Sequence, residues 1–146
     1  MIRISKILSV AATICALHAG PLHAQSEAVR FTTSFPFYVS SQKMPAGTYT
    51  ARKLDIDSQV LLIRDVDSSH SAVVQYHPTQ SIEPVSQGKV TFHQYGDADY
   101  LSGFTLTGDE TGMQLPESIG EKRAALAEER VASTRSVALQ SGVPGY

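Results

Sequence analysis

A regular succession of short alternating segments constrains the fold of this chain more than any other feature. From Val29 to Phe35 the large apolar side chains fall on every second position, which is the period of a strand with one buried face. Similar segments recur along the chain, with Pro, Gly, Asp or Ser between them. Spacing of this kind predicts an all-β fold, either an antiparallel β-sandwich or a small β-barrel of about seven to eight strands.

The same pattern predicts where the strands lie. We expect them at 29–35, 37–39, 48–54, 60–63, 70–76, 89–95, 100–107 and 113–115. The continuous apolar run at 60–63 predicts a central strand covered on both faces. Residues 77–88 contain two prolines, which cannot donate to a strand ladder, and are expected to form a loop. Residues 96–99 predict a four-residue polar turn within a β-hairpin.

A change of pattern after Pro116 ends the predicted β domain, which covers residues 25–116. Ser118 and Glu121 form an S-x-x-E capping box before Ala- and Glu-rich sequence, so we expect a C-terminal α-helix at 117–132. Its apolar face is thin, which predicts that the helix packs loosely or projects. Residues 133–146 have few large apolar side chains and are expected to be a flexible tail.

The N-terminal segment 1–24 has the organisation of a secretory signal peptide. Arg3 and Lys6 precede an apolar run at 7–17, and a Gly-Pro pair follows it. A signal peptide needs about 7–15 apolar residues, whereas a membrane-spanning helix needs about 20. Cleavage near Ala24 would deliver a secreted or periplasmic protein; the alternative is a buried N-terminal helix of the domain.

Composition excludes several classes of function for the exported domain. The only cysteine, Cys15, lies in the signal segment, so the domain would have no disulfide and no thiolate nucleophile. The formal net charge of the whole chain is −2, and no run of basic residues is longer than two, which predicts no nucleic-acid partner. No later stretch is long and apolar enough to cross a bilayer, so no integral membrane segment is expected after signal cleavage.

Three histidines lie beyond the signal segment. His70 and His77 are separated by an odd number of positions, which on a strand directs them to opposite faces. His77 and His93 could approach across neighbouring strands, but no spacing indicates a third ligand for a metal ion. We therefore predict no metal ligand and no cofactor, with the histidines on solvated sheet surfaces.

Acidic residues cluster in pairs at the predicted turns. The pairs are Asp55 and Asp57, Asp65 and Asp67, Asp97 and Asp99, and Asp109 and Glu110. Such oxygens could bind calcium, but Asp is also an ordinary turn residue because its side chain accepts hydrogen bonds from nearby backbone N–H groups. The turn interpretation is favoured, and the best calcium candidate is the hairpin at 96–99.

No catalytic residue is predicted. Ser102, His93 and Asp97 can be drawn as a triad across a hairpin, but there is no G-x-S-x-G elbow and no evident oxyanion hole. The enzyme alternative is a hydrolase-type site assembled from loop residues such as His77, Asp97 and Asp99. We expect a protein without catalytic activity rather than an enzyme.

Several ordered blocks of sequence resemble a family of small, exported, β-rich proteins of soil bacteria that has no established activity. The blocks are 35–37 (FPF), 44–49 (MPAGTY), 61–64 (LLIR), 90–97 (VTFHQYGD) and 115–118 (LPES). Met44 and Gln94 depart from the family pattern, where we expect Leu and a basic residue. The resemblance implies export and a β fold, and it transfers no catalytic residue.

The leading functional hypothesis is a non-catalytic exported β module. It would bind a partner, polymer or ligand in the cell envelope or outside the cell, for example an envelope protein, a glycan or an apolar ligand. The first alternative is a small β-barrel that carries an apolar ligand, which requires a cavity of roughly 300 Å³ or more. The second is the hydrolase-type enzyme.

Overall fold

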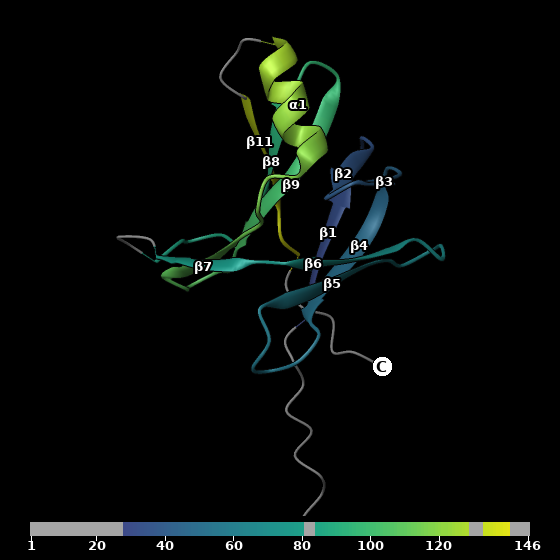
Figure 1. Ribbon diagram of the computed structural model, residues 1–146. Coiled ribbons are helices and arrows are strands. Elements are labelled where there is room, and N and C mark those ends of the chain that lie inside the picture. Colours follow the sequence, from purple (N-terminus) through teal and green to yellow (C-terminus); the bar gives the residue numbers. More distant parts are fainter. Residues whose placement is uncertain (1–27, 81–83, 129–132, 141–146) are drawn as a thin grey trace, which may run out of the picture.

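The described part of the chain folds into two β-sheets and one α-helix (Figure 1). The computed structural model describes residues 28–80, 84–128 and 133–140, so the predicted signal segment 1–24 lies outside it. The two sheets stay open at their edges and do not close into a cylinder. Of the two architectures predicted from the sequence, the protein therefore adopts the β-sandwich.

A four-stranded antiparallel sheet forms the first layer, in the order β1-β4-β5-β6. Its strands are β1 (Val29–Thr33), β4 (Gly47–Lys53), β5 (Val60–Asp65) and β6 (Ser71–Gln75). Strands β4, β5 and β6 follow one another along the chain, and short turns join them. Between β1 and β4 the chain forms β2 and β3.

A seven-stranded sheet forms the second layer, with the main order β11-β8-β9-β10-β7. These five strands are β7 (His77–Gln80), β8 (Lys89–Tyr95), β9 (Ala98–Thr105), β10 (Thr111–Gln114) and β11 (Ser133–Ala138). The short β2 (Phe37–Val39) pairs antiparallel with β3 (Gln42–Met44) and parallel with β9. The pair between β2 and β9 brings the rings of Tyr38 and Tyr100 into a stack with centroids 5.1 Å apart.

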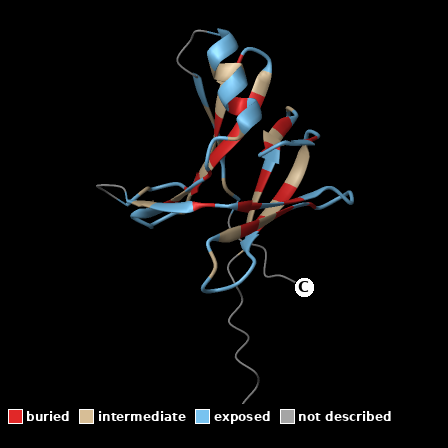
Figure 2. Ribbon diagram, in the orientation of Figure 1, coloured by how far each residue is buried: buried red, intermediate tan, exposed pale blue. Residues whose placement is uncertain are grey.

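The hydrophobic core lies between the sheets, as the buried segments in Figure 2 show. Phe31 and Tyr49 from the four-stranded sheet stack at a centroid distance of 5.6 Å, and Phe104 from the other sheet meets Phe31 edge-on at 5.8 Å. Aromatic rings fill a sandwich interior well because each buries a large apolar area. Full burial stabilises the fold by about 1.5–3 kcal/mol for a side chain of this size.

The prediction that the strand at 60–63 is covered on both faces is wrong. In β5, Leu61 and Ile63 are buried, whereas Val60 and Leu62 are only half-buried. The four-stranded sheet packs against the core on one face, so the second face of its central strand remains partly open to solvent. A continuous apolar run therefore did not require two covering layers.

Two predicted loops contain strand residues. Residues 77–80 form β7, which includes Pro78 and pairs with β10. Proline is tolerated there because β7 is an edge strand, where one side of the backbone needs no ladder partner. The predicted four-residue turn at 96–99 has only Gly96 and Asp97 at its tip, because Tyr95 already pairs with Ala98. Gly96 adopts a φ of 57°, which favours glycine.

The predicted flexible tail at 133–146 is wrong for its first part. Residues 133–138 form β11, which adds to the edge of β8 over six residue pairs. Beyond it, the Gln140 N–H donates to the Arg30 carbonyl at 2.8 Å, which links this segment to the other sheet. Val137 and Leu139, two positions apart, pack against the core. Pairing with β8 therefore orders this segment, although it contains few large apolar residues.

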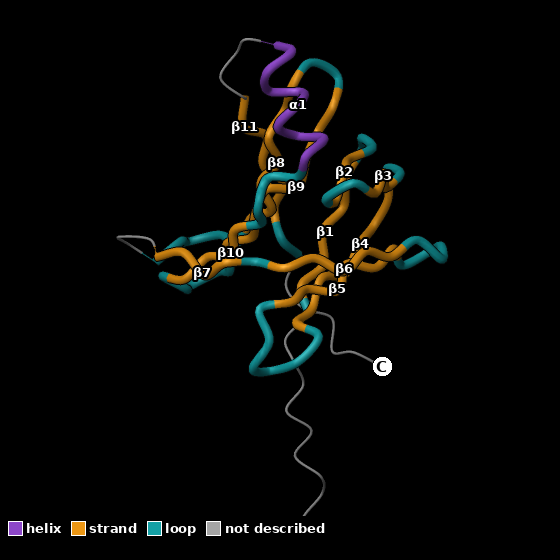
Figure 3. Tube along the Cα trace, in the orientation of Figure 1, coloured by secondary structure: helices purple, strands orange, loops and turns teal. Residues whose placement is uncertain are grey.

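The predicted C-terminal helix is confirmed as α1 (Ile119–Glu128), which lies beside β8 at one end of the seven-stranded sheet (Figure 3). The thin apolar face of the helix consists of Ile119, Leu126 and Val131 with alanines. Ile119 and Leu126 are 72% and 80% exposed, and Val131 lies outside the described residues. The one buried residue of α1 is a glutamate, Glu121. Among the described residues, no helix is long and apolar enough to span a membrane.

Candidate functional site

A pocket of about 320 Å³ is lined by residues of both sheets. Most of its lining is apolar, and both layers contribute. The apolar lining residues are Val29, Ala51, Ile56, Leu61, Leu106 and Met113. They come from β1, β4, β5 and β10 and from the loops that follow β4 and β9. A volume of about 300–1,000 Å³ with apolar walls is typical of small-molecule sites.

Charged side chains complete the lining of this pocket. Arg52 and Lys53 come from the end of β4, and Asp109 comes from the turn between β9 and β10. Ile56, on the loop after β4, lines the pocket and is 67% exposed. An exposed isoleucine at the mouth of an apolar pocket is available to be covered by a ligand, and its burial would be favourable.

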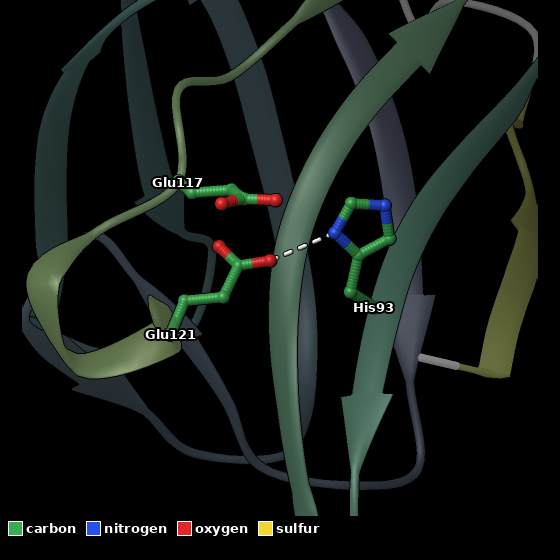
Figure 4. A group of neighbouring side chains, drawn as sticks. All are labelled: His93, Glu117 and Glu121. Atoms are coloured by element: carbon green, nitrogen blue, oxygen red, sulfur yellow. Dashed lines mark hydrogen bonds and ion pairs between the residues drawn. The ribbon is translucent and has the colours of Figure 1, made fainter. Parts of the chain in front are cut away.

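A second cluster of chemically reactive side chains lies at the other end of the seven-stranded sheet (Figure 4). His93 projects from β8, and Glu117 and Glu121 come from the start of α1 and the residues just before it. Nδ1 of His93 lies 2.7 Å from Oε1 of Glu121. One ligand atom from each of the three residues lies within 4.8 Å of the other two.

Glu121 reaches this position because Ser118 caps the start of α1. The Ser118 hydroxyl accepts a hydrogen bond from the Glu121 backbone N–H at 3.0 Å, which is the first half of the predicted capping box. In a full capping box the glutamate would bond back to the backbone N–H of the serine. Here Oε1 of its carboxylate lies 2.7 Å from Nδ1 of His93 instead, so a hydrogen bond joins the first turn of α1 to β8.

Negative charge at this cluster affects two neighbouring tyrosines. Burial raises the pKa of the Tyr95 hydroxyl, and the carboxylates of Glu121 and Glu117 raise it further. Burial also raises the pKa of Tyr100, and the Tyr38 hydroxyl and Glu121 raise it further. Because a phenol becomes negatively charged when it ionises, nearby carboxylates disfavour that form. The cluster is therefore a region of negative potential.

The three histidines considered in the sequence are not brought together. His70 lies in the turn before β6, where Nδ1 is 2.9 Å from the Ser68 hydroxyl. His77 begins the edge strand β7, and β10 and β9 separate it from His93 on β8. The argument from opposite strand faces does not apply, because His70 is outside a strand.

The acidic pair predicted as the best calcium candidate is split. Asp97 is exposed at the hairpin tip, whereas Asp99 is buried within β9. Oδ2 of Asp99 lies 3.3 Å from a guanidinium nitrogen of Arg135 on β11. Burial raises the pKa of Asp99, and the positive charge of Arg135 opposes that rise. The two carboxylates therefore occupy different environments. His77, the third residue of the predicted loop-assembled enzyme, lies on β7, which β10 separates from β9.

Asp65 has the role expected of a turn residue. Its carboxylate accepts hydrogen bonds from the Asp67 backbone N–H at 2.9 Å and from the Ser68 hydroxyl at 2.7 Å. These bonds stabilise the ionised form and lower the pKa of Asp65. The carboxylate is thus used to close the turn after β5.

The drawn triad of Ser102, His93 and Asp97 does not form. Ser102 is buried in β9, and its hydroxyl donates to the Thr91 carbonyl at 3.0 Å. His93 is engaged with Glu121, so it does not act as a base toward Ser102. The buried serine therefore satisfies its own hydrogen-bonding group within the sheet.

Comparisons with protein-family models, curated proteins and solved structures found no match. The resemblance to exported proteins of soil bacteria stays a prediction. Sequence reasoning did not associate Glu117 and Glu121 with His93. Their i, i+4 spacing was a local signal, but the histidine lies 28 positions from Glu121, so only the fold joins them.

Proposed function

We propose that this chain is an exported, non-catalytic β module that binds a small amphiphile, with an apolar body and an acidic head, in the pocket between its sheets. The observation that carries the proposal is the pocket itself, about 320 Å³ in volume and lined by both layers. Its apolar walls suit a hydrocarbon chain, whose transfer from water is favoured by about 0.8 kcal/mol for each buried CH₂ group.

Charge at the pocket favours an acidic head group. Arg52 and Lys53 are exposed neighbours that both line the pocket, against a single acid, Asp109. Guanidinium groups bind carboxylates and phosphates through paired hydrogen bonds. An amphiphile could therefore place its chain between the sheets and its head against the end of β4.

Export of the chain is supported by its N-terminal sequence. The charged start, the short apolar run and the small residue at Ala24 are the three parts of a secretory signal. Amino-terminal sequencing of the protein recovered from the periplasm or the medium tests this proposal. We expect the first residue to be Gln25, and recovery of the intact chain from the cytoplasm would contradict export.

Ligand binding is tested with decanoate and its neutral counterpart decanol. A ligand that binds only the folded state raises the melting temperature as its concentration rises. We expect decanoate to raise it more than decanol does, because only decanoate can pair with Arg52. Equal responses would contradict the acidic head group, and no response to either would contradict an amphiphile site.

Two variants locate the binding. Ile56→Gln removes an exposed apolar side chain from the pocket mouth, and we expect decanoate affinity to fall by about tenfold, the equivalent of about 1.4 kcal/mol. Val73→Gln is the matched control, because Val73 is a 60% exposed apolar residue on β6 that does not line the pocket. Equal losses in both variants would show that binding is not in the pocket.

A further inference from the structure

We propose that His93, Glu117 and Glu121 form a binding site for a divalent transition-metal ion of the zinc type. The three side chains approach from β8 and from the start of α1, and their ligand atoms lie within 4.8 Å of one another (Figure 4). The site is separate from the pocket between the sheets and does not depend on the proposed amphiphile.

The burial of Glu121 requires explanation. Its side chain is only 4% exposed, and His93 is the one side-chain partner of its carboxylate among the described residues, although a buried carboxylate is costly unless its charge is fully compensated. Among the described residues, its hydrogen bond to His93 ends on Oε1, which leaves Oε2 available as a ligand atom. Figure 4 shows the carboxyl groups of Glu121 and Glu117 facing each other beside the imidazole.

The charges at the cluster are unbalanced. Glu117 and Glu121 bring two negative charges to one place, and neither forms an ion pair with a lysine or arginine in the part of the chain that the structure describes. Like charges at short range repel each other, most strongly where solvent is excluded. A divalent cation between them would neutralise both carboxylates.

The chemistry of the donors indicates which ion fits. One imidazole nitrogen with two carboxylate oxygens is a ligand set that suits zinc and similar transition metals. Calcium prefers six to eight oxygen ligands and does not need an imidazole. Three protein ligands would leave a further position for water. Binding would replace the direct contact of His93 with Glu121 by two bonds to the ion.

A metal ion at this position would also attach the helix. The large apolar side chains Ile119 and Leu126 are exposed, so little apolar burial holds α1 against the sheet. Glu121 is the buried residue of α1. A metal ion bound by both Glu121 and His93 would fix the first turn of α1 to β8. Metal binding of this kind stabilises the folded state directly.

The test is a zinc titration of the full, untagged chain, measured by calorimetry. Bound metal is first removed with a chelator. We expect one zinc ion bound at this site, and we expect Glu117→Gln to weaken its affinity by about tenfold or more. Glu117 is exposed, so this variant should keep the fold, which circular dichroism checks. His93→Asn should give a similar loss.

Matched controls separate this site from other zinc-binding groups of the chain. His77→Asn removes an exposed imidazole on β7 outside the cluster and should leave the affinity of the site unchanged. Calcium should not displace zinc. Three results would each overturn the proposal. The first is equal zinc affinity in the wild-type chain and Glu117→Gln. The others are the absence of zinc binding by the folded wild-type chain and displacement of zinc by calcium at comparable concentration.

Discussion

Removal of Arg135 is predicted to make the stability of the protein depend more strongly on the ionisation of Asp99. The two side chains join β11 to β9, with 3.3 Å between their nearest charged atoms. Asp99 is 5% exposed and its Oδ1 has no hydrogen-bond partner among the described residues. Arg135→Met keeps most of the side-chain volume and removes the charge that faces this carboxylate.

The expected magnitude follows from two opposing effects on Asp99. Coulomb attraction at 3.3 Å is about 5 kcal/mol at an effective dielectric constant of about 20. The guanidinium is 38% exposed, so solvent screens it, and the net cost of removing it should be about 1–2 kcal/mol. Burial outweighs this attraction, since the pKa of Asp99 is raised overall.

The raised pKa fixes the sign of the pH dependence. In the folded state the carboxyl group of Asp99 holds its proton to higher pH than it does in the unfolded chain, so its contribution to stability falls as pH rises between the two pKa values. Arg135→Met removes the one opposing charge, which raises the folded pKa further. The loss of stability should therefore be larger near neutral pH than at pH about 4.

Urea denaturation at several pH values measures this effect as the free energy of unfolding. The control is the double variant Asp99→Asn with Arg135→Met, which has no buried charge and should recover most of the stability at neutral pH. The contact of Arg135 with the Phe35 ring, at 4.3 Å, is lost in both variants and cancels. A loss that is independent of pH, or no recovery in the double variant, would refute the reasoning.

Three further predictions test other parts of the structure. Burial and the negative charge of Asp65 raise the pKa of Tyr49 to about 12, so a phenolate titration followed by ultraviolet absorbance should show an ionisation about two pH units above that of an ordinary phenol. Gly103→Ala should destabilise the fold by about 1–3 kcal/mol in thermal denaturation, because a Cβ would lie 2.7 Å from the Met113 carbonyl oxygen. Glu117→Gln should leave decanoate affinity unchanged, and an altered affinity would mean that the two proposed sites interact.

Strand positions could be predicted because the signals for them are local. Alternation and turn residues define β1, β4 and β8 within a few residues of their observed limits. The errors depend on neighbours that the sequence does not identify. β7 and β11 are strands because each pairs with an edge of the seven-stranded sheet. Pro78 does not prevent the pairing of β7 at an edge, and a scarcity of apolar residues does not prevent that of β11.

The environment of individual polar residues could be predicted only where their partners are close in sequence. The sequence predicts Asp65 as a turn residue, and Asp67 and Ser68 supply the donors to its carboxylate. The sequence also predicts Glu121 as part of a capping box, and its backbone N–H bonds to Ser118. Its carboxylate instead bonds to His93 on β8, a contact that exists only after the sheet and the helix have assembled.

The long β8–β9 hairpin separates the two proposed sites. Lys89 of β8 pairs with Thr105 near the pocket, whereas His93 pairs with Tyr100 near the helix. Four residues of strand span about 13 Å, so no side chain of the metal cluster reaches the pocket lining. Sites separated by more than about 7–10 Å without a shared partner usually respond to substitution independently. The proposed amphiphile binding is therefore expected to be independent of the proposed metal ion.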